Sequence, residues 1–367
     1  LHKAIRRQRQ MCIRDSNTGL DASFLKGKLR FTVDVYQKYI KDLLQKKVKM
    51  PTSIGYGNGY EVSYMNSGKM TNKGWEFRVD AVPFENRDWR VGFYFNIAHN
   101  ENKITEMPDN YTEENYTFNN GEYAYRREEG RPMGSFYGYR YKGVCQNKDA
   151  TYARDADGNV MKDISGNAIV MRNGTATIAP GDALYEDINH DGVINQYDIV
   201  YLGNSNPRFT GGAGVNVSYK QFKLSAIFYG RYGQDVVNST RLNNESMRGI
   251  DNQSTAVLRR WRNEGDQTDI PRALYGEGYN TLGSDRFVED ASYLRLKSLS
   301  FNYRLPKKII QRWGFNNIDV YVTGYNLFTW TKYTGQDPEV KTENTYARDS
   351  ATTPASIQLV AGFNLSF

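Results

Sequence analysis

The feature that most constrains this chain is a repeated alternation of apolar and polar residues along short segments. In residues 28–36 every second residue is apolar, with Leu29, Phe31, Val33 and Val35 alternating with Arg30, Thr32, Asp34 and Tyr36. The same pattern recurs in residues 75–81, 89–98, 222–228, 299–305 and 318–322. A period of two places successive side chains on opposite faces of a β-strand. Each segment therefore predicts a strand with one apolar and one polar face.

Strands of this kind build either a soluble sandwich around an apolar core or a membrane barrel around a polar lumen. About eleven strands are predicted, and the connections between them alternate in length. The short connections are residues 26–28, 83–88, 131–134, 220–221 and 306–317, and the long ones are 41–71, 101–121, 146–208, 232–291 and 330–356. Outer-membrane barrels have this alternation. Loops this long without a core of their own are uncommon in soluble domains, so the pattern favours an all-β, transmembrane antiparallel β-barrel.

The C-terminal segment adds a second sign. Residues 357–367 alternate in the same way and end on Phe367. A last strand that ends on an aromatic residue is similar to the signal read by outer-membrane assembly machinery, although a soluble β-protein can end in the same way. Bacterial barrels have an even number of strands. Because an odd count cannot close such a barrel, we expect further strands upstream and interpret the chain as part of a larger barrel.

The alternation also predicts which side chains face lipid. An Arg on the lipid face costs about 2–4 kcal/mol near the membrane midplane, so the charged face must be the inner one. The residues predicted to face lipid are Phe31, Val33, Val35, Phe93 and Phe95, and those predicted to face the interior are Arg30, Asp34, Arg90 and Asn96.

Composition excludes several other classes of protein. No run of about 18 apolar residues occurs, and the mean hydropathy is −0.70, so a transmembrane helix is excluded. The net charge is +7, but residues 1–16 hold five basic residues and one acidic residue and so contribute +4 of it. The remaining +3 is spread along strands and loops, so no nucleic-acid partner is predicted.

Residues 1–16 (LHKAIRRQRQMCIRDS) stand apart from the rest of the chain. They show no strand or helix periodicity, and they resemble a translated assembly scar. We predict that residues 1–16 are foreign to the gene and make no ordered contact with the barrel. The barrel portion is then residues 17–367.

No catalytic constellation is visible, so the chain is not predicted to be an enzyme. The three histidines and two cysteines are far apart in sequence, and there is no nucleophile elbow, P-loop or dinucleotide-binding glycine motif. Two pairs of carboxylates could be offered as acid and base, namely Glu128 with Glu129 and Asp337 with Glu339. Most such pairs are solvated surface charges, and no spacing rule selects one of them. No catalytic residue is assigned.

One loop has the spacing of a metal site. The segment DINHDGVINQYD, residues 187–198, places oxygen-bearing groups at positions 1, 3, 5, 7, 9 and 12, with Gly192 at position 6 for the sharp turn. The predicted ligands of one structural Ca²⁺ are Asp187, Asn189, Asp191, the carbonyl of Val193, Asn195 and Asp198. The loop departs from the EF-hand rule because Asp198 replaces the usual bidentate Glu. The alternative is an Asn- and Asp-rich turn that needs no metal.

Several segments, in order, resemble one known family. Residues 70–104 hold an N-x-G-x-E strand followed by a Trp-containing strand that ends in NENKI. Further similar segments are GRPMGSFYGYRYKGV (130–144), GDALYEDINHDGVINQYDIVYLGNSNPRFTGG (181–212), YLRLKSLSFNYRLP (293–306) and VTGYNLFTWTKYTGQDPEV (322–340). Their order and spacing are similar to the SusC/RagA-type TonB-dependent receptors.

The resemblance implies a 22-stranded barrel, of which this chain would be the C-terminal half without the plug. It also implies a location in the outer membrane of Bacteroidota and import of oligosaccharides or peptides. The expected partners are a SusD-like surface lipoprotein, the TonB complex through the missing N-terminal region, and outer-membrane lipid.

Two rival functions stay open from the sequence alone. A secreted calcium-binding β-rich protein that acts on glycans would also have Asp-rich loops and exposed aromatic residues. A passive porin or adhesin barrel is disfavoured only by the family resemblance. The loop aromatics Tyr111, Tyr116, Trp330 and Tyr333 suit stacking on sugar rings, but barrels also place Tyr and Trp at the membrane interfaces. No residue is assigned to substrate binding.

Overall fold

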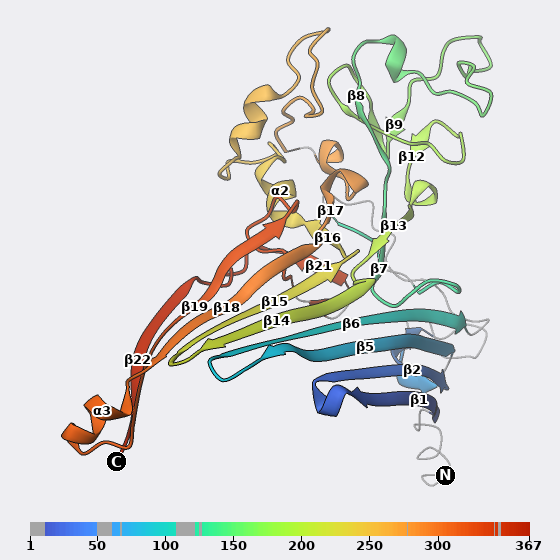
Figure 1. The fold of residues 1–367 in the computed structure, drawn as a ribbon. Coiled ribbons are helices and arrows are strands. Elements are labelled where there is room, and N and C mark those ends of the chain that lie inside the picture. The colour runs from blue at the N-terminus through green and yellow to red at the C-terminus, as the bar shows by residue number, and fades with distance from the viewer. Residues whose placement is uncertain are drawn as a thin grey trace.

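The dominant element is one antiparallel sheet of nine strands in the order β1-β2-β5-β6-β14-β15-β18-β19-β22 (Figure 1). The computed structural model describes residues 12–49, 61–66, 68–107, 122–124, 127–276, 278–340, 342–343 and 346–367. The nine strands are β1 (Cys12–Phe24), β2 (Leu29–Lys41), β5 (Lys69–Glu85), β6 (Trp89–Glu106), β14 (Phe209–Tyr219), β15 (Phe222–Tyr232), β18 (Tyr293–Arg304), β19 (Asn317–Thr331) and β22 (Gln358–Ser366). This confirms the prediction of an all-β, antiparallel barrel fold.

The connections of this sheet are short at one end and long at the other, as predicted. Figure 1 shows the tight turns gathered at the lower left and the long excursions at the opposite end. The last short connection contains α3 (Lys307–Ile310) and the 3₁₀ turn η8 (Gln311–Trp313). The long connections are residues 42–68, 107–208, 233–292 and 332–357. We call these two ends the turn side and the loop side.

The number of strands in the large sheet is nine, not about eleven, because one predicted short turn is wrong. Residues 131–134 do not lie on the turn side. They precede β7 (Ser135–Gly138) and β8 (Tyr141–Val144), which pair with β13 (Val200–Asn204) and β11 (Ala183–Tyr185). All four residues of β7 are buried. This segment therefore belongs to the interior of the loop assembly and does not alternate between two environments.

A second correction concerns the N-terminal residues. Cys12 to Ser16 continue β1 and pair in register with residues 37–41 of β2, from Cys12 opposite Lys41 to Ser16 opposite Gln37. Strand pairing uses the main chain, so it does not require the side-chain alternation that these residues lack. The prediction that residues 1–16 make no ordered contact is wrong for these five residues. Residues 1–11 lie outside the described residues, and the foreign origin of the segment stays a prediction.

The loop side holds its own small sheets and helix. The remaining strands are β3 (Leu44–Lys49), β4 (Glu61–Asn66), β9 (Arg172–Asn173), β10 (Ala176–Thr177), β12 (Val193–Ile194), β16 (Asp235–Asn238), β17 (Val288–Asp290), β20 (Thr342–Glu343) and β21 (Tyr346–Asp349). Helix α2 (Ser239–Asn244) and several 3₁₀ turns accompany them. In the part of the chain that the structure describes, no helix has the length and apolar character needed to cross a membrane.

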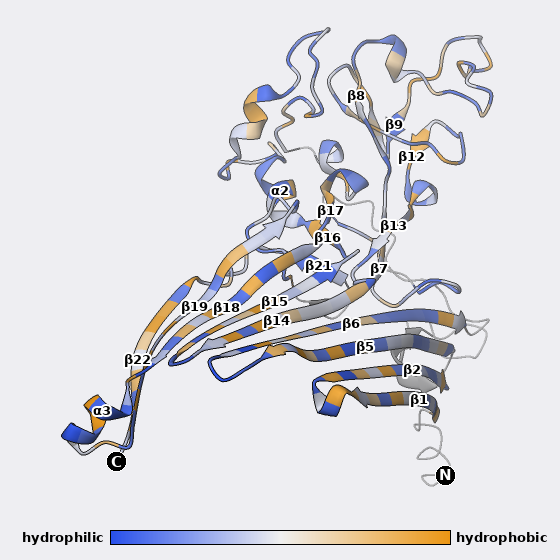
Figure 2. Cartoon of the chain, in the orientation of Figure 1, coloured by the Kyte–Doolittle hydropathy of each residue, from blue (hydrophilic) through white to orange (hydrophobic). Residues whose placement is uncertain are grey.

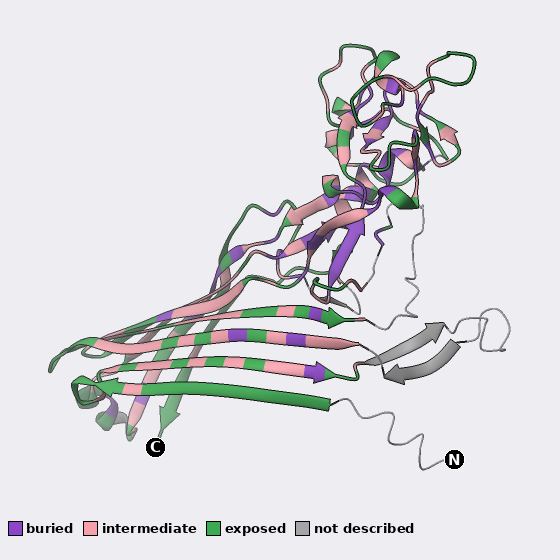
Figure 3. Ribbon diagram, turned by 90° about the vertical axis from the view of Figure 1, so that its right-hand side faces the viewer, coloured by how far each residue is buried: buried purple, intermediate pink, exposed green. Residues whose placement is uncertain are grey.

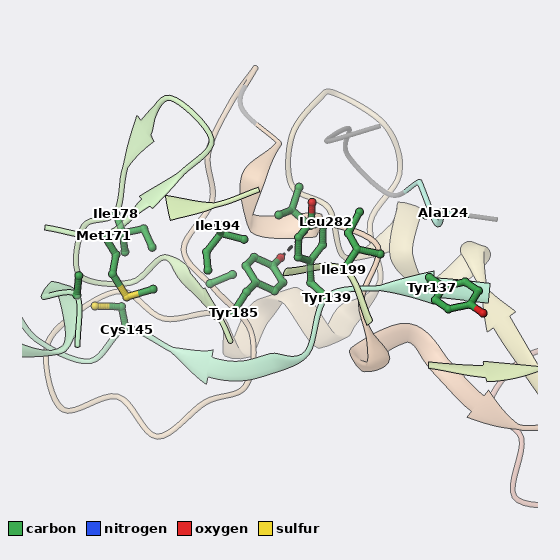
Figure 4. Packing of buried hydrophobic residues seen from close by; sticks show 12 residues of the cluster. Ala124, Tyr137, Tyr139, Cys145, Met171, Ile178, Tyr185, Ile194, Ile199 and Leu282 are labelled. Carbon is green, nitrogen blue, oxygen red and sulfur yellow. Dashed lines mark hydrogen bonds between the residues drawn. The ribbon is translucent and has the colours of Figure 1, made fainter. Parts of the chain in front are cut away.

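The long loops bury cores of their own, which the sequence argument did not anticipate. The largest cluster joins residues of β7, β8, β11 and β13 with neighbouring turns; Figure 4 shows Tyr139, Tyr185 and Ile199 packed together, with Cys145 beside Met171. A second cluster surrounds Phe136 and Phe287. Figure 3 shows that buried residues gather in the loops, while the large sheet is mostly exposed or half-buried. The barrel wall and the loops are therefore stabilised in different ways.

Candidate functional site

One face of the large sheet is apolar, and its side chains are exposed or half-buried. Cross-strand partners point to the same side of a sheet, and one such row runs across β6, β14, β15, β18 and β19. The row consists of Val91, Val217, Leu224, Phe301 and Val322. Figure 2 shows the alternation of apolar and polar positions along β2 and β5. An apolar face that extends over at least these five strands exceeds what a soluble monomer exposes.

The residues predicted to share this face do so. Val33, Val35, Phe93 and Phe95 are all exposed. Phe31 is opposite Val79, which is itself opposite Phe95. The prediction that these residues lie on one side is confirmed.

The other face carries the polar residues, as predicted. Arg30 pairs with Asp80 of β5, Arg90 pairs with Ser218 of β14, and Asn96 pairs with Gly212. Hydrogen bonds link neighbouring strands on this face. They include Thr32 Oγ1 to Asp21 Oδ1 at 2.7 Å, Ser225 Oγ to Asn216 Oδ1 at 2.7 Å and Arg304 Nε to Asp319 Oδ1 at 2.9 Å. This face is chemically suited to an aqueous lumen.

Glycines opposite tyrosines are a feature of the polar face that sequence reasoning missed. Gly74 is the partner of Tyr36, and Gly214 is the partner of Tyr94. A methyl group on Gly214 would overlap the ring of Tyr94, so the tyrosine ring occupies the space that a side chain at this position would need. The signal exists only in the register between strands, because neither residue is unusual within its own strand.

Two rows of aromatic rings border the apolar face. The loop-side aromatic row consists of Trp75, His99, Phe209 and Tyr232, whose ring centroids lie 6.1 Å (Trp75 to Phe209), 5.2 Å (His99 to Phe209) and 6.5 Å (Phe209 to Tyr232) apart. The turn-side aromatic row consists of Trp89, Tyr219, Phe222 and Tyr303, with 4.3 Å from Trp89 to Tyr219 and 4.7 Å from Phe222 to Tyr303. Transmembrane barrels carry such girdles at both membrane interfaces.

The distance between the two rows matches a membrane. Phe209 and Tyr219 are the first and last residues of β14, which has 11 residues. Ten steps of about 3.3 Å give about 33 Å along the strand. A strand tilt of about 40° reduces this to about 25 Å, which is the height of the apolar band of outer-membrane barrels.

Ion pairs fix the loops near the loop-side end of β18. Arg295 is 3% exposed and binds Asp337 at 2.5 Å and Glu339 at 2.9 Å, while Lys297 also binds Glu339 at 2.8 Å. Burial opposes ionisation of Asp337, but the N–H groups of Ala355 and Glu339 and the Arg295 guanidinium outweigh it and lower the pKa of this carboxyl. The pair Asp337 and Glu339 is thus occupied with ion pairing.

A second buried ion-pair cluster lies beside α2. Glu245 is 5% exposed and pairs with Arg241 at 3.0 Å and with Arg286 at 2.8 Å. Arg241 also reaches Glu289 at 3.3 Å, so segments distant in sequence are tied together. Buried charges of this kind require partners. Their role here is to shape the loop assembly.

The other pair of carboxylates proposed from the sequence is also occupied. Glu128 accepts a hydrogen bond from the hydroxyl of Tyr137 at 2.8 Å, and Glu129 accepts one from the N–H of Met107 at 2.7 Å. The contacts of these two pairs of carboxylates do not favour their use as the acid and base of a glycosidase.

The loop aromatics named from the sequence have different surroundings. Trp330 is exposed on the apolar face, opposite Leu294. Tyr333 is 6% exposed and donates a hydrogen bond to Asp349 at 2.7 Å. Tyr111 and Tyr116 lie outside the described residues. Of the two residues that the structure describes, Trp330 therefore lies on the apolar face and Tyr333 is buried in the loops, so these two do not form a sugar-binding platform together.

The predicted calcium loop is folded around its own main chain. Asp187 Oδ2 accepts from Gly192 N at 2.8 Å, and Asp191 Oδ1 accepts from Val193 N at 2.8 Å. Asp198 is buried and accepts from Ile188 N and from Asn195 N, both at 2.8 Å. Of the other predicted ligands, Asn189 donates to Asp191 at 2.9 Å, and the side chain of Asn195 donates to the carbonyl of Val193 at 3.1 Å.

Because the predicted ligands make hydrogen bonds within the loop, the binding of Ca²⁺ by this loop stays a prediction. Gly192 has a φ of +82°, the left-handed conformation expected at position 6. Nevertheless, among the residues that the structure describes, no three His, Cys, Asp or Glu side chains converge as metal ligands.

Together the long antiparallel strands, the apolar face between two aromatic rows and the folded loops on one side define the wall of a β-barrel of the outer-membrane type. Comparison with known proteins agrees. The chain is 32% identical over 336 residues to TonB-dependent receptor P3 of Formosa agariphila, and 26% identical over 361 residues to TonB-dependent receptor SusC of Bacteroides thetaiotaomicron. The alignments cover 89% and 96% of this chain but 30% and 31% of those proteins.

Solved structures give the same result. The structure of the RagAB peptide transporter matches with a TM-score of 0.70 and 27% identity, covering 97% of this chain and 35% of that chain. No family model matches the sequence. The chain belongs to the SusC/RagA-type TonB-dependent receptors, and it spans about a third of the length of the relatives it matches.

Proposed function

We propose that this chain forms part of the wall of an outer-membrane importer for oligosaccharides or peptides. The observation that carries the proposal is the apolar face between the two aromatic rows, whose separation of about 25 Å fits a bilayer. The family relationship supports import as the activity. The polar face of the sheet then lines the lumen through which substrate passes.

The loop side is proposed to face the cell exterior. The long loops of outer-membrane barrels are extracellular, and their short turns are periplasmic. The buried clusters around Tyr139 and Phe136 and the ion pairs of Arg295 make these loops a folded platform. A folded platform is a suitable seat for a SusD-like surface lipoprotein, which is the proposed partner on this side.

Energy for import is proposed to come from the TonB complex. We propose that the segment that contacts TonB and the plug that fills the lumen lie in the part of the full-length protein that this chain does not span; the coverage of about a third of the relatives' length is consistent with this. The proposed substrates are oligosaccharides or peptides, as the family resemblance implies, and the similarity to the RagAB peptide transporter supports the peptide class.

The function is tested by deleting the whole gene in its own host and measuring uptake of defined oligosaccharide and peptide mixtures. We expect one of the two classes to lose uptake and to regain it when the gene is restored. As a control, a restored gene that lacks the TonB-contact segment should give a correctly located protein without uptake. Unchanged uptake of both classes in the deletion strain would contradict the proposal.

A structural Ca²⁺ in the loop from Asp187 to Asp198 is proposed as a stabiliser of the loop platform. The support is the ligand spacing together with the left-handed Gly192. Binding would require the side chains to exchange some of their hydrogen bonds to main-chain N–H groups for the ion.

A further inference from the structure

The apolar face of the large sheet is interrupted by a groove just below the loop-side aromatic row. The next row of cross-strand partners consists of Phe77, Ile97, Gly211, Gly230, Leu294 and Trp330. Two adjacent glycines therefore stand in a row that is otherwise made of bulky apolar residues. Their missing side chains leave a groove of about 660 Å³ over β14 and β15.

The walls of the groove are exposed and apolar. Leu294 is 47% exposed and Trp330 is 53% exposed on one side, and Tyr232, which is 61% exposed, belongs to the aromatic row above. Ala213 lines the groove on the turn side and is small. The volume falls within the range of about 300–1,000 Å³ that is usual for small-ligand sites.

Charged and polar groups occur where the groove reaches the loop side. Lys332 lines the groove and is exposed. Asp290 lines it too, but its carboxylate already accepts hydrogen bonds from both the N–H and the hydroxyl of Ser292. Arg231 lines the groove as well, but it alternates onto the polar face and donates to the hydroxyl of Tyr229 at 3.2 Å. The ammonium group of Lys332 is therefore the cation left to attract an anion from outside the protein.

We propose that the groove binds one acyl chain of a phosphate-bearing lipid in the loop-side leaflet, with the lipid phosphate at Lys332. The proposal rests on the proposed membrane function and adds a defined lipid site to it. The groove is continuous with the apolar face, so the occupant is a lipid chain rather than a soluble molecule. The cation at its loop-side end lies where a headgroup would be, next to the aromatic row that marks the interface.

Quenching of Trp330 provides the test, because brominated acyl chains quench the fluorescence of a tryptophan that they touch. The full-length protein is reconstituted in phosphatidylcholine vesicles that contain a small fraction of brominated phosphatidylglycerol or brominated phosphatidylcholine. The signal of Trp330 is taken as the difference between the wild type and Trp330→Phe. We expect phosphatidylglycerol to quench Trp330 at a several-fold lower mole fraction, and Lys332→Gln to remove this preference.

A variant that fills the groove distinguishes binding in the groove from ordinary contact with bilayer lipid. Side chains cannot be added at the glycines without strain, since a Cβ at Gly211 would stand 2.5 Å from the carbonyl oxygen of Asn96. Ala213→Phe fills the groove instead, and we expect it to weaken quenching by both lipids. The matched control is Ala226→Phe on the neighbouring strand β15. It adds the same ring to the apolar face of the sheet, at a residue that does not line the groove.

The possible failures are distinguishable. Equal quenching by both lipids, unchanged in Ala213→Phe and Lys332→Gln, would show ordinary bilayer contact and overturn the groove proposal alone. If neither lipid quenches Trp330, and Trp89 of the turn-side aromatic row is not quenched either, the sheet is not in the bilayer and the proposed function fails with it.

Discussion

Val215→Arg places a charge at the middle of the apolar face, and its cost decides what covers that face. Val215 lies near the centre of β14, is 41% exposed and has Phe93 and Ala226 as cross-strand partners. If water covered the face, an exposed substitution of this kind would change the free energy of unfolding by about 0.5 kcal/mol or less. If lipid covers it, the Arg costs about 2–4 kcal/mol near the midplane. The two environments therefore differ by more than 1 kcal/mol.

The matched control places the same charge at a different depth in the membrane. Tyr219→Arg adds the same charge to the same face of the same strand, but in the turn-side aromatic row. Near an interface the cost of Arg falls to about 0–1 kcal/mol, to which the loss of the Tyr219 contact with Trp89 adds about 0.5–1.5 kcal/mol. We therefore expect Val215→Arg to be the more costly of the two.

The assay is urea unfolding of the full-length protein folded into phospholipid vesicles, followed by tryptophan fluorescence. Asn216→Gln, one residue along on the polar face, controls for disturbance of β14. A cost below about 1 kcal/mol for Val215→Arg would refute the reasoning, because that value is below the range for Arg at the midplane.

Three further predictions concern the loops. Arg295→Met leaves Asp337 and Glu339 without their buried partner and should destabilise the 332–357 loop by about 3 kcal/mol. Lys297→Met should cost about 1 kcal/mol or less. Hydrogen exchange of the loop measures both costs, and equal costs would contradict the ion-pair assignment. Calcium titration should release heat with the wild type and none with Asp187→Ala combined with Asp191→Ala, while equal heats would mean that the loop is only a turn. Burial, followed by the charge of Asp290, raises the pKa of Asp235 in the folded protein. The stability of the loops should therefore fall as the pH rises from the ordinary Asp range through this higher pKa. Asp235→Asn should remove that pH dependence when proteolysis of the loops is measured across the range, and an unchanged pH profile would refute the prediction.

Much of the barrel wall was predictable because its signal is local. The alternation in residues 28–36 and 89–98 gave the faces of β2 and β6 correctly, since a period of two survives in any environment with two different sides. The short and long connections gave the two ends of the sheet. The segments around β7 and β8 were misplaced because β7 is a short strand whose four residues are all buried among the loops, so it has no second face in contact with a different environment.

The rest of the site depends on contacts between distant residues. The loop-side aromatic row joins Trp75, His99, Phe209 and Tyr232 from four strands, and only the register reveals it. The same holds for Gly211 beside Gly230, and for Arg295 with Glu339, which are separated by 44 residues. The spacing of the predicted calcium ligands, in contrast, is local and can be recognised in the sequence. Spacing alone does not show whether these side chains bind a metal ion or main-chain N–H groups.

Cysteine labelling in intact membranes tests the central claim most directly. Val33→Cys, Phe93→Cys and Arg90→Cys are made in a full-length protein in which Cys12 is changed to Ser and Cys145 to Ala, and a membrane-impermeant aqueous thiol reagent is applied to opened outer-membrane fragments. If the apolar face contacts lipid and the polar face lines an aqueous interior, Arg90→Cys is labelled while Val33→Cys and Phe93→Cys are protected until detergent is added. Labelling of Val33→Cys and Phe93→Cys as fast as Arg90→Cys before detergent would contradict the membrane barrel.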